Sequence, residues 1–178
     1  MLNKKLSVRD LCYISIFTAV IAVCAQISIP MPYGIVPLTL QTFAIMLAGA
    51  VLGTRNGTVS AVVYVLLGMA GAPVFAYFSG GPGIVFGPTG GFILTFPLVA
   101  MSAGIGAKKD SRLWLTLWII AGIAVNYAGG ILMYGMVTST NLMNSFFIMA
   151  QFLPTEAIKI VAVVMTEKAI RKATRMKT

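Results

Sequence analysis

The sequence has no histidine, and it has only four acidic residues among its 178. Without histidine, neither a Ser-His nor a Cys-His nucleophile can form, and the commonest metal ligand is missing. The two cysteines, Cys12 and Cys24, lie in one apolar run, about 18 Å apart along a helix, so they cannot form a disulfide with each other. No G-x-x-x-x-G-K-S/T phosphate-binding motif occurs. We therefore expect no enzyme, no metal site and no cofactor held by this chain.

Charge is scarce, because Asp, Glu, Lys and Arg make up 10% of the chain where a soluble domain has about 25%. Hydrophobic residues make up 58%. A small soluble fold cannot bury that much apolar surface, since much of any small fold faces water. The composition therefore excludes a soluble enzyme and a disordered chain, and it predicts an all-α integral membrane protein.

Three long uncharged runs, 11–54, 56–107 and 113–155, separate the charged clusters. A membrane-spanning helix needs about 20 apolar residues, so the first two runs each have room for two helices. The third run, with the apolar segment that continues to about 170, has room for two more. Clusters of Gly, Pro, Ser, Thr and Asn mark the breaks. The sequence thus predicts one domain, 1–178, with six transmembrane helices at about 10–29, 38–54, 57–76, 89–107, 113–137 and 154–173. Residues 145–153 are expected either as a short interfacial helix or as the first turns of the last span.

The positive charges predict the orientation of this bundle. With six spans, both termini and two of the loops lie on one side, where twelve of the thirteen positive residues fall. The opposite loops, about 30–37, 73–88 and 138–144, carry no charge. By the positive-inside rule the basic side is cytoplasmic, so the excess of positive charge is a topology signal and we expect no nucleic-acid partner. The twelve residues are Lys4, Lys5, Arg9, Arg55, Lys108, Lys109, Arg112, Lys168, Arg171, Lys172, Arg175 and Lys177.

Glu156 and Lys159 are the acid and the base that remain outside these clusters. Lys159 precedes Lys168 by about 13.5 Å of helix, which places the pair within the membrane. The two residues are three apart, so they share a helix face. A charge buried in the membrane costs about 3 kcal/mol or more and needs a partner. The pair is either an ion pair that fixes helix packing or a site for a polar ligand in a cavity, and we favour the second interpretation.

A glycine-rich segment, 79–91, leads into the fourth expected helix. Glycine allows the backbone to approach a ligand closely, and the amides at a helix start attract anions. The alternative is a plain flexible loop. Polar side chains within the expected spans either line a cavity or bond between helices, and aromatic residues suit an apolar ligand ring. The candidate ligand-binding residues beyond the charged pair are Gly87, Thr89, Gly90, Phe92, Gln41, Asn126 and Tyr127.

The first expected span carries two pairs of small residues, Ser15 with Ala19 and Thr18 with Ala22. Small residues four apart let helices approach closely. These pairs serve either internal packing or a docking face for a partner membrane protein.

Five segments together carry a resemblance to a known family. They are Ala25-Gln-Ile-Ser-Ile-Pro30, Val36-Pro-Leu-Thr-Leu-Gln-Thr-Phe43, Leu47-Ala-Gly-Ala-Val-Leu-Gly53, Gly87-Pro-Thr-Gly-Gly-Phe92 and Leu153-Pro-Thr-Glu-Ala-Ile-Lys159. On these segments the chain resembles the BioY family, the biotin-specific substrate-binding subunits (S components) of energy-coupling factor (ECF) transporters. The family's usual last motif is Pro-Gly-Asp-x-x-Lys, whereas this chain has Thr155 and Glu156. Its usual docking motif has alanines where this chain has Ser15 and Thr18.

The resemblance implies a six-helix S component in the plasma membrane of a prokaryote, with both termini cytoplasmic. It implies high-affinity binding and uptake of biotin, with a transmembrane T subunit and two ATPase subunits as partners, which alone use ATP. The ureido ring of biotin suits Glu156 and Lys159, and its carboxylate then meets the amides of the glycine-rich segment. The opposite pose, with Lys159 holding the carboxylate, stays open. The alternatives in function are an S component for another vitamin and a stand-alone small-molecule carrier.

Overall fold

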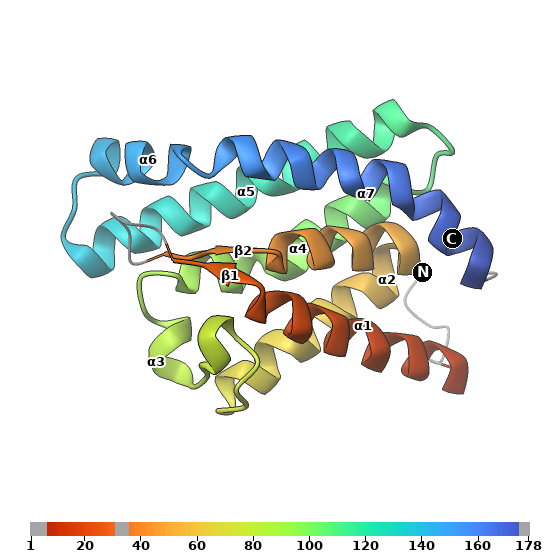
Figure 1. Ribbon diagram of the computed structural model, residues 1–178, viewed down its shortest axis with the longest axis horizontal. Coiled ribbons are helices and arrows are strands. Elements are labelled where there is room, and N and C mark those ends of the chain that lie inside the picture. Colours follow the sequence, from red (N-terminus) through yellow and green to blue (C-terminus); the bar gives the residue numbers. More distant parts are fainter. Residues whose placement is uncertain (1–6, 31–35, 175–178) are drawn as a thin grey trace.

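The computed structural model describes residues 7–30 and 36–174, and helices make up most of this part of the chain (Figure 1). The expectations for Lys4, Lys5, Arg175 and Lys177, and for part of the 30–37 loop, lie outside the described residues. The elements in chain order are α1 (Val8–Gln26), β1 (Ser28–Ile29), β2 (Leu38–Thr39), α2 (Gln41–Met69), η1 (Ala76–Phe78), α3 (Pro82–Val85), α4 (Gly90–Gly106), α5 (Arg112–Thr138), α6 (Leu142–Ala150) and α7 (Leu153–Thr174).

Short polar side chains define where several helices begin. Ser7 accepts a hydrogen bond from the backbone N–H of Asp10, whose carboxylate accepts from the backbone of Ser7 in return, so α1 starts with a capping box. Ser111 caps α5 through the N–H of Trp114, and Asn141 caps α6. These caps explain why the predicted starts of the first and fifth spans lie within two residues of the observed ones.

The helix α2 covers the second and third expected spans, and it corrects only the loop expected between them near Arg55. The chain stays helical past that residue and breaks only at Gly53, whose φ of 78° lies in the left-handed region that favours glycine. The two halves of α2 fold back on each other. They pack so closely that a Cβ added to Gly57 would lie 2.6 Å from the Cα of Gly49. One glycine and a glycine-to-glycine contact thus replace the expected loop.

Three expected spans stop short of their predicted bounds at the uncharged end of the molecule. The third, expected as 57–76, ends with α2 at Met69. Residues 28–29 and 38–39 form a two-stranded antiparallel pair, with Ser28 opposite Thr39 and Ile29 opposite Leu38. This pairing ends α1 at Gln26 and delays the start of α2 to Gln41. The first half of α2, residues 41–52, is therefore only about 18 Å long, less than the roughly 30 Å of a bilayer core.

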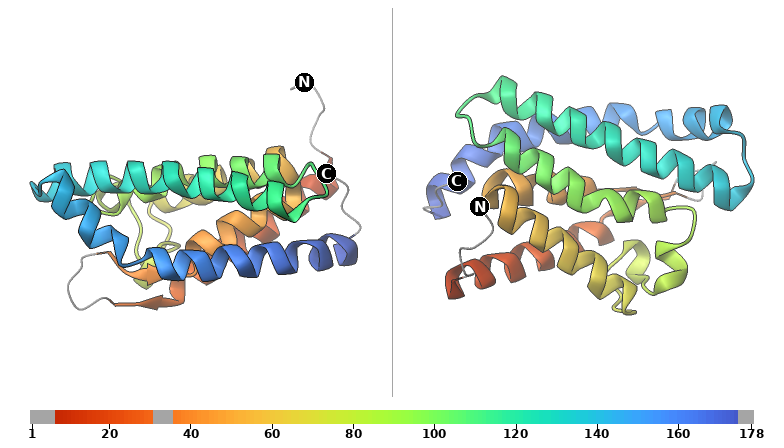
Figure 2. Two further views of the ribbon diagram at one scale, coloured as in Figure 1. Left: turned by 90° about the horizontal axis from the view of Figure 1, so that it is seen from above. Right: turned by 180° about the vertical axis from the view of Figure 1, so that it is seen from behind.

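The charged segments gather at one end of the molecule. In Figures 1 and 2 the start of α1, the break in α2, the α4–α5 loop and the end of α7 all lie toward the same end. Contacts join them in pairs: Asn56 donates to Asp10 at 2.9 Å, and Lys168 forms an ion pair with Asp110 at 2.6 Å. The uncharged strands and the segment between α2 and α4 lie at the opposite end (Figure 1).

Helix α4 packs between α2 and α5, and glycines bring their backbones close. A Cβ on Gly49 would lie 2.1 Å from the carbonyl oxygen of Ala100 in α4, and one on Gly91 would lie 2.0 Å from that of Gly129 in α5. Apolar side chains such as Ile45, Val99 and Ile119 are fully buried between these helices. Since lipid offers no hydrophobic drive, close packing of this kind is what holds such helices together.

Three helices of the described residues, α1, α2 and α5, are long and apolar enough to cross a membrane. The pair α6 and α7, bent by 52°, would make a fourth if it were one span, whereas α4 is apolar but shorter. The prediction of an all-α membrane protein is confirmed, and the count of six spans stays a prediction. Residues 145–150 belong to the short helix α6, which a bend of 52° separates from α7, and an interfacial position of α6 stays a prediction.

Candidate functional site

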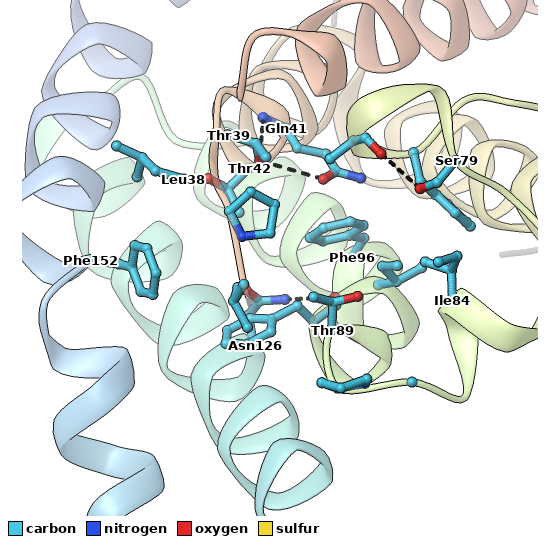
Figure 3. Close-up of a pocket in the computed structure, with 18 of the residues that line it drawn as sticks. Leu38, Thr39, Gln41, Thr42, Ser79, Ile84, Thr89, Phe96, Asn126 and Phe152 are labelled. Atoms are coloured by element: carbon cyan, nitrogen blue, oxygen red, sulfur yellow. Dashed lines mark hydrogen bonds between the residues drawn. The ribbon is translucent and has the colours of Figure 1, made fainter. Parts of the chain in front are cut away.

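A cavity of ≈ 230 Å³ lies where the first turns of α2, α4 and α7 meet the middle of α5 (Figure 3). Helix N-termini carry partial positive charge, so three helix dipoles favour a negative or polar group here. The segments 36–39 and 75–89 complete the walls. In Figure 3, Phe152 and Ser79 stand on opposite sides of the cavity, with Asn126 and Thr89 between them.

One wall of the cavity holds a closed set of three polar side chains. Lys159 Nζ lies 2.6 Å from Glu156 Oε1, and both side chains are only 7% exposed. Thr42, in the first turn of α2, donates its hydroxyl to the Glu156 carboxylate at 3.0 Å and accepts from Lys159 Nζ at 2.9 Å. The Thr42–Glu156–Lys159 triad therefore joins α2 to α7 and carries no net charge.

The triad retains capacity to bind a ligand. An ammonium group has three N–H donors, and the contacts to Glu156 and Thr42 use two of those on Lys159. A carboxylate accepts about four hydrogen bonds, more than Thr42 and Lys159 supply to Glu156. The triad can thus donate to one ligand oxygen and accept from a ligand N–H at the same time.

Asn126 places a second acceptor at the cavity. Its side chain is fully buried, and its Nδ2 donates to the carbonyl oxygen of Phe92 at 2.9 Å and to Thr95 Oγ1 at 2.8 Å. Within the described part of the chain, the Oδ1 atom of Asn126 has no hydrogen-bond partner. An unpaired buried acceptor costs about 1–3 kcal/mol, which a ligand N–H would recover.

Gln41 also lines the cavity, and its amide is already engaged. Its Nε2 donates to the hydroxyl of Tyr64, which in turn donates to the carbonyl oxygen of Val74 at 2.9 Å. Tyr64 is fully buried, and its ring packs edge-to-face on Phe75 at 5.5 Å between centroids. Gln41 thus links the start of α2 to the 74–79 segment.

Aromatic rings form the apolar part of the cavity. Phe92 and Tyr127 pack edge-to-face with centroids 5.8 Å apart. Phe75, Phe96 and Phe152 are almost fully buried and also line the space. An aromatic cavity with a few convergent polar groups is the usual form of a site for a small organic molecule.

Eight of the nine predicted ligand-binding residues line this one cavity, although they come from four different parts of the chain. Gly90 is the exception. A Cβ there would lie 1.8 Å from the carbonyl oxygen of Val85, so Gly90 permits the close approach of α3 to α4 rather than contact with a ligand. The eight are Glu156, Lys159, Gln41, Asn126, Tyr127, Gly87, Thr89 and Phe92.

Thr42 and the rings of Phe75, Phe96 and Phe152 lie in the site without having been predicted there. Thr42 stands one residue after Gln41, in a segment already singled out by its resemblance, which was the available signal. The phenylalanines carry no such signal, because apolar residues face both lipid and protein in a membrane helix.

The predicted docking residues on α1 do not share one face. Ser15 and Ala19 are exposed and Ala22 is half-buried, as an outer face requires. Thr18 is only 6% exposed, and its hydroxyl contacts the carbonyl oxygens of Ile14 and, at 3.2 Å, Ser60 in α2. Of the two roles expected for these pairs, Thr18 therefore serves internal packing and not the docking face.

Comparison with known proteins agrees with this geometry. A sequence model described as the BioY family matches residues 1–176. The chain is 47% identical over 124 residues to "Biotin transporter BioY" of Thermotoga maritima, covering 69% of this chain and 72% of that protein. It is 32% identical over 177 residues to "Biotin transporter BioY" of Rhodobacter capsulatus, covering 91% and 93%.

A solved structure has the same fold. The S component for biotin from an ECF-type ABC transporter superposes with a TM-score of 0.87 at 25% sequence identity, covering 93% of this chain and 92% of that one. The predicted S-component-like bundle is thereby confirmed.

Proposed function

Because this chain belongs to the BioY family, we propose that it binds biotin in the cavity between α2, α4, α5 and α7 and carries it through the membrane. Its family and fold are those of a transporter and not of an enzyme. The observation that carries the proposal is that the neutral Thr42–Glu156–Lys159 triad and Asn126, whose Oδ1 has no partner among the described residues, line one aromatic cavity.

The ureido group of biotin fits these polar atoms by their donor and acceptor pattern. A ureido group has two N–H donors and one carbonyl acceptor. Glu156 and the Asn126 Oδ1 are acceptors for the N–H groups, and Lys159 is a donor for the carbonyl oxygen. The triad has no net charge, and a ligand carboxylate there would be repelled by Glu156. We therefore favour the ureido end of biotin at the triad over the opposite pose.

The rest of biotin then follows the apolar and glycine-rich walls. Its sulfur-containing ring packs among Phe92, Tyr127 and Phe152, where it buries apolar surface. Its carboxylate extends toward the wall formed by Gly83, Gly87 and Thr89. Thr89 directly precedes α4, so a carboxylate there meets the positive end of that helix dipole.

The gathering of charge at one end of the bundle supports the proposed topology. By this proposal the chain makes six passes, formed by α1, the two halves of α2, α4, α5, and α6 with α7 as one bent span. The basic end then lies in the cytoplasm by the positive-inside rule, together with both termini. The cavity is lined by the segments 36–39 and 75–89 of the opposite end, so by this proposal biotin enters from the outer side.

We propose an ECF assembly as the context of this activity. The related solved chain is the S component of such a transporter. By this proposal a transmembrane T subunit and two ATPase subunits supply the energy, and this chain binds no nucleotide itself. The exposed Ser15 and Ala19 on α1 are the candidate contacts for the T subunit.

Thermal unfolding of the purified protein with and without ligand tests the proposal. A ligand that binds only the folded state at 100 times its Kd stabilises it by about 2.7 kcal/mol, so biotin should raise the melting temperature by several degrees. Thiamine and riboflavin serve as matched controls and should not. A rise with another vitamin but not with biotin would contradict the biotin assignment.

Uptake into vesicles separates the assembly from a carrier that works alone. Vesicles that contain only this chain should bind biotin without accumulating it. Accumulation by those vesicles would contradict the need for ATPase partners.

A further inference from the structure

Gln26, the last residue of α1, uses both ends of its side-chain amide to hold the 74–79 segment. Its Nε2 donates to the carbonyl oxygen of Phe75 at 3.0 Å and to that of Ala22, on its own helix, at 3.1 Å. Its Oε1 accepts from the backbone N–H of Phe78 at 2.8 Å. Gln26 does not line the cavity, so its side chain acts on the wall and not on a ligand.

The segment held by Gln26 is a wall of the cavity in an unfavourable conformation. Phe75, Tyr77 and Ser79 line the cavity. Tyr77 and Phe78 have φ of 59° and 52°, in the left-handed region that residues with a Cβ adopt at a cost. Two neighbouring residues of this kind persist only where other bonds hold them. The hydrogen bond from the Phe78 N–H to Gln26 Oε1 is one such bond.

The same end of α1 also holds the facing wall. The N–H of Leu40 donates to the carbonyl oxygen of Ile27 at 3.1 Å. The β1–β2 pairing joins residues 28–29 to Leu38 and Thr39, which line the cavity. The end of α1 is therefore bonded to two cavity walls, through the backbone to one and through the Gln26 side chain to the other.

We propose that Gln26 is a positioning residue for the ligand site, which keeps the 75–79 wall closed around bound biotin. This inference rests on the proposed function. Because the Gln26 side chain bonds to the wall and to its own helix but does not line the cavity, its loss leaves the polar partners of the ligand in place and loosens the wall. The bound ligand should then leave faster, while entry of the ligand is little affected.

The decisive variant is Gln26→Met, which keeps the length of the side chain and removes both hydrogen-bonding ends. The biotin dissociation rate of Gln26→Met should rise about tenfold, the change expected for two lost hydrogen bonds, while the association rate stays within about twofold. Gln151→Met is the matched control, because Gln151 is exposed and its side chain bonds only to the nearby Ile148 carbonyl. It should leave both rates unchanged.

A ligand-free measurement keeps this test separate from the proposed function. A nitroxide label at the exposed Phe78, introduced as Phe78→Cys with Cys12→Ser and Cys24→Ala, reports the mobility of the wall. Gln26→Met should raise the mobility of this label without biotin, and Gln151→Met should not. Unchanged mobility of the label in Gln26→Met would overturn the inference. So would a Gln26→Met protein that has a lower melting temperature but an unchanged biotin dissociation rate. Failure of the wild type to bind biotin would refute the proposed function, while the label would still decide the role of Gln26.

Discussion

Neutralising the Glu156–Lys159 pair one residue at a time and then together separates ligand binding from helix packing. Both side chains are 7% exposed and lie 2.6 Å apart, so either single change strands a buried charge. Breaking such a pair costs about 3–5 kcal/mol of folding stability, whereas replacing both partners by neutral side chains is often neutral. Glu156→Gln and Lys159→Met should each lower the melting temperature, and the double variant should recover it.

The affinity for biotin should behave differently from the stability. A hydrogen bond to a charged group contributes about 1.5–3 kcal/mol, so Glu156→Gln should raise the Kd by about 10- to 150-fold. The double variant lacks both charged partners of the ureido group, so its Kd should stay high although the fold is restored. Titration calorimetry gives the Kd, and unfolding without ligand gives the stability.

The ion pair at the basic end provides the matched control. Lys168 and Asp110 also lie 2.6 Å apart, but their side chains are 43% and 89% exposed. Exposed pairs contribute little, so Asp110→Asn with Lys168→Met should alter neither stability nor affinity measurably. If the Glu156→Gln, Lys159→Met double variant bound biotin like the wild type, the pair would serve packing alone and the reasoning would be refuted.

Three further changes test other parts of the structure. Asn126→Leu should raise the Kd for biotin by about tenfold, because the Oδ1 acceptor is lost. Thr95→Val removes only a hydrogen-bonding neighbour of the Asn126 amide and should leave the Kd unchanged. Equal effects of the two variants would contradict a contact between Asn126 and the ligand. Ala19→Leu on the exposed face of α1 should abolish copurification with a T subunit and leave biotin binding intact, and normal copurification would contradict the docking face. Gly57→Ala should cost about 1–3 kcal/mol of stability in chemical unfolding because its Cβ meets the Gly49 backbone, while Gly83→Ala, with open space around it, should unfold normally.

The ends of most helices could be predicted from the sequence, because charged residues are costly within the membrane and therefore mark the ends of its spans. Capping residues mark where a helix begins. Ser7 and Ser111 cap helices close to where the charge pattern indicated their starts. Arg55 marked the reversal between the second and third expected spans. That a single residue, Gly53, makes this reversal left no trace, because one glycine in an apolar run looks like any packing glycine. The β1–β2 pair was equally hidden, since two residues on each strand show no alternation.

The candidate site was predictable wherever polarity was out of place. Glu156, Lys159 and Asn126 stand out in apolar spans, and all three line the cavity. The direction in which a side chain points was harder to predict, since a membrane helix is apolar toward lipid and toward protein alike. The sequence therefore did not separate the buried Thr18 from the exposed Ala19 on α1. The role of Gln26 depends on a wall 49 to 52 residues further along the chain, which no local pattern reveals.

Equilibrium binding of radiolabelled biotin to the purified chain in lipid nanodiscs tests the central claim most directly. We predict saturable binding of one biotin per chain, displaced by unlabelled biotin but not by thiamine or riboflavin. The same measurement on Glu156→Gln should show binding weakened by at least about tenfold. Absence of saturable biotin binding to the folded wild-type chain would contradict the account.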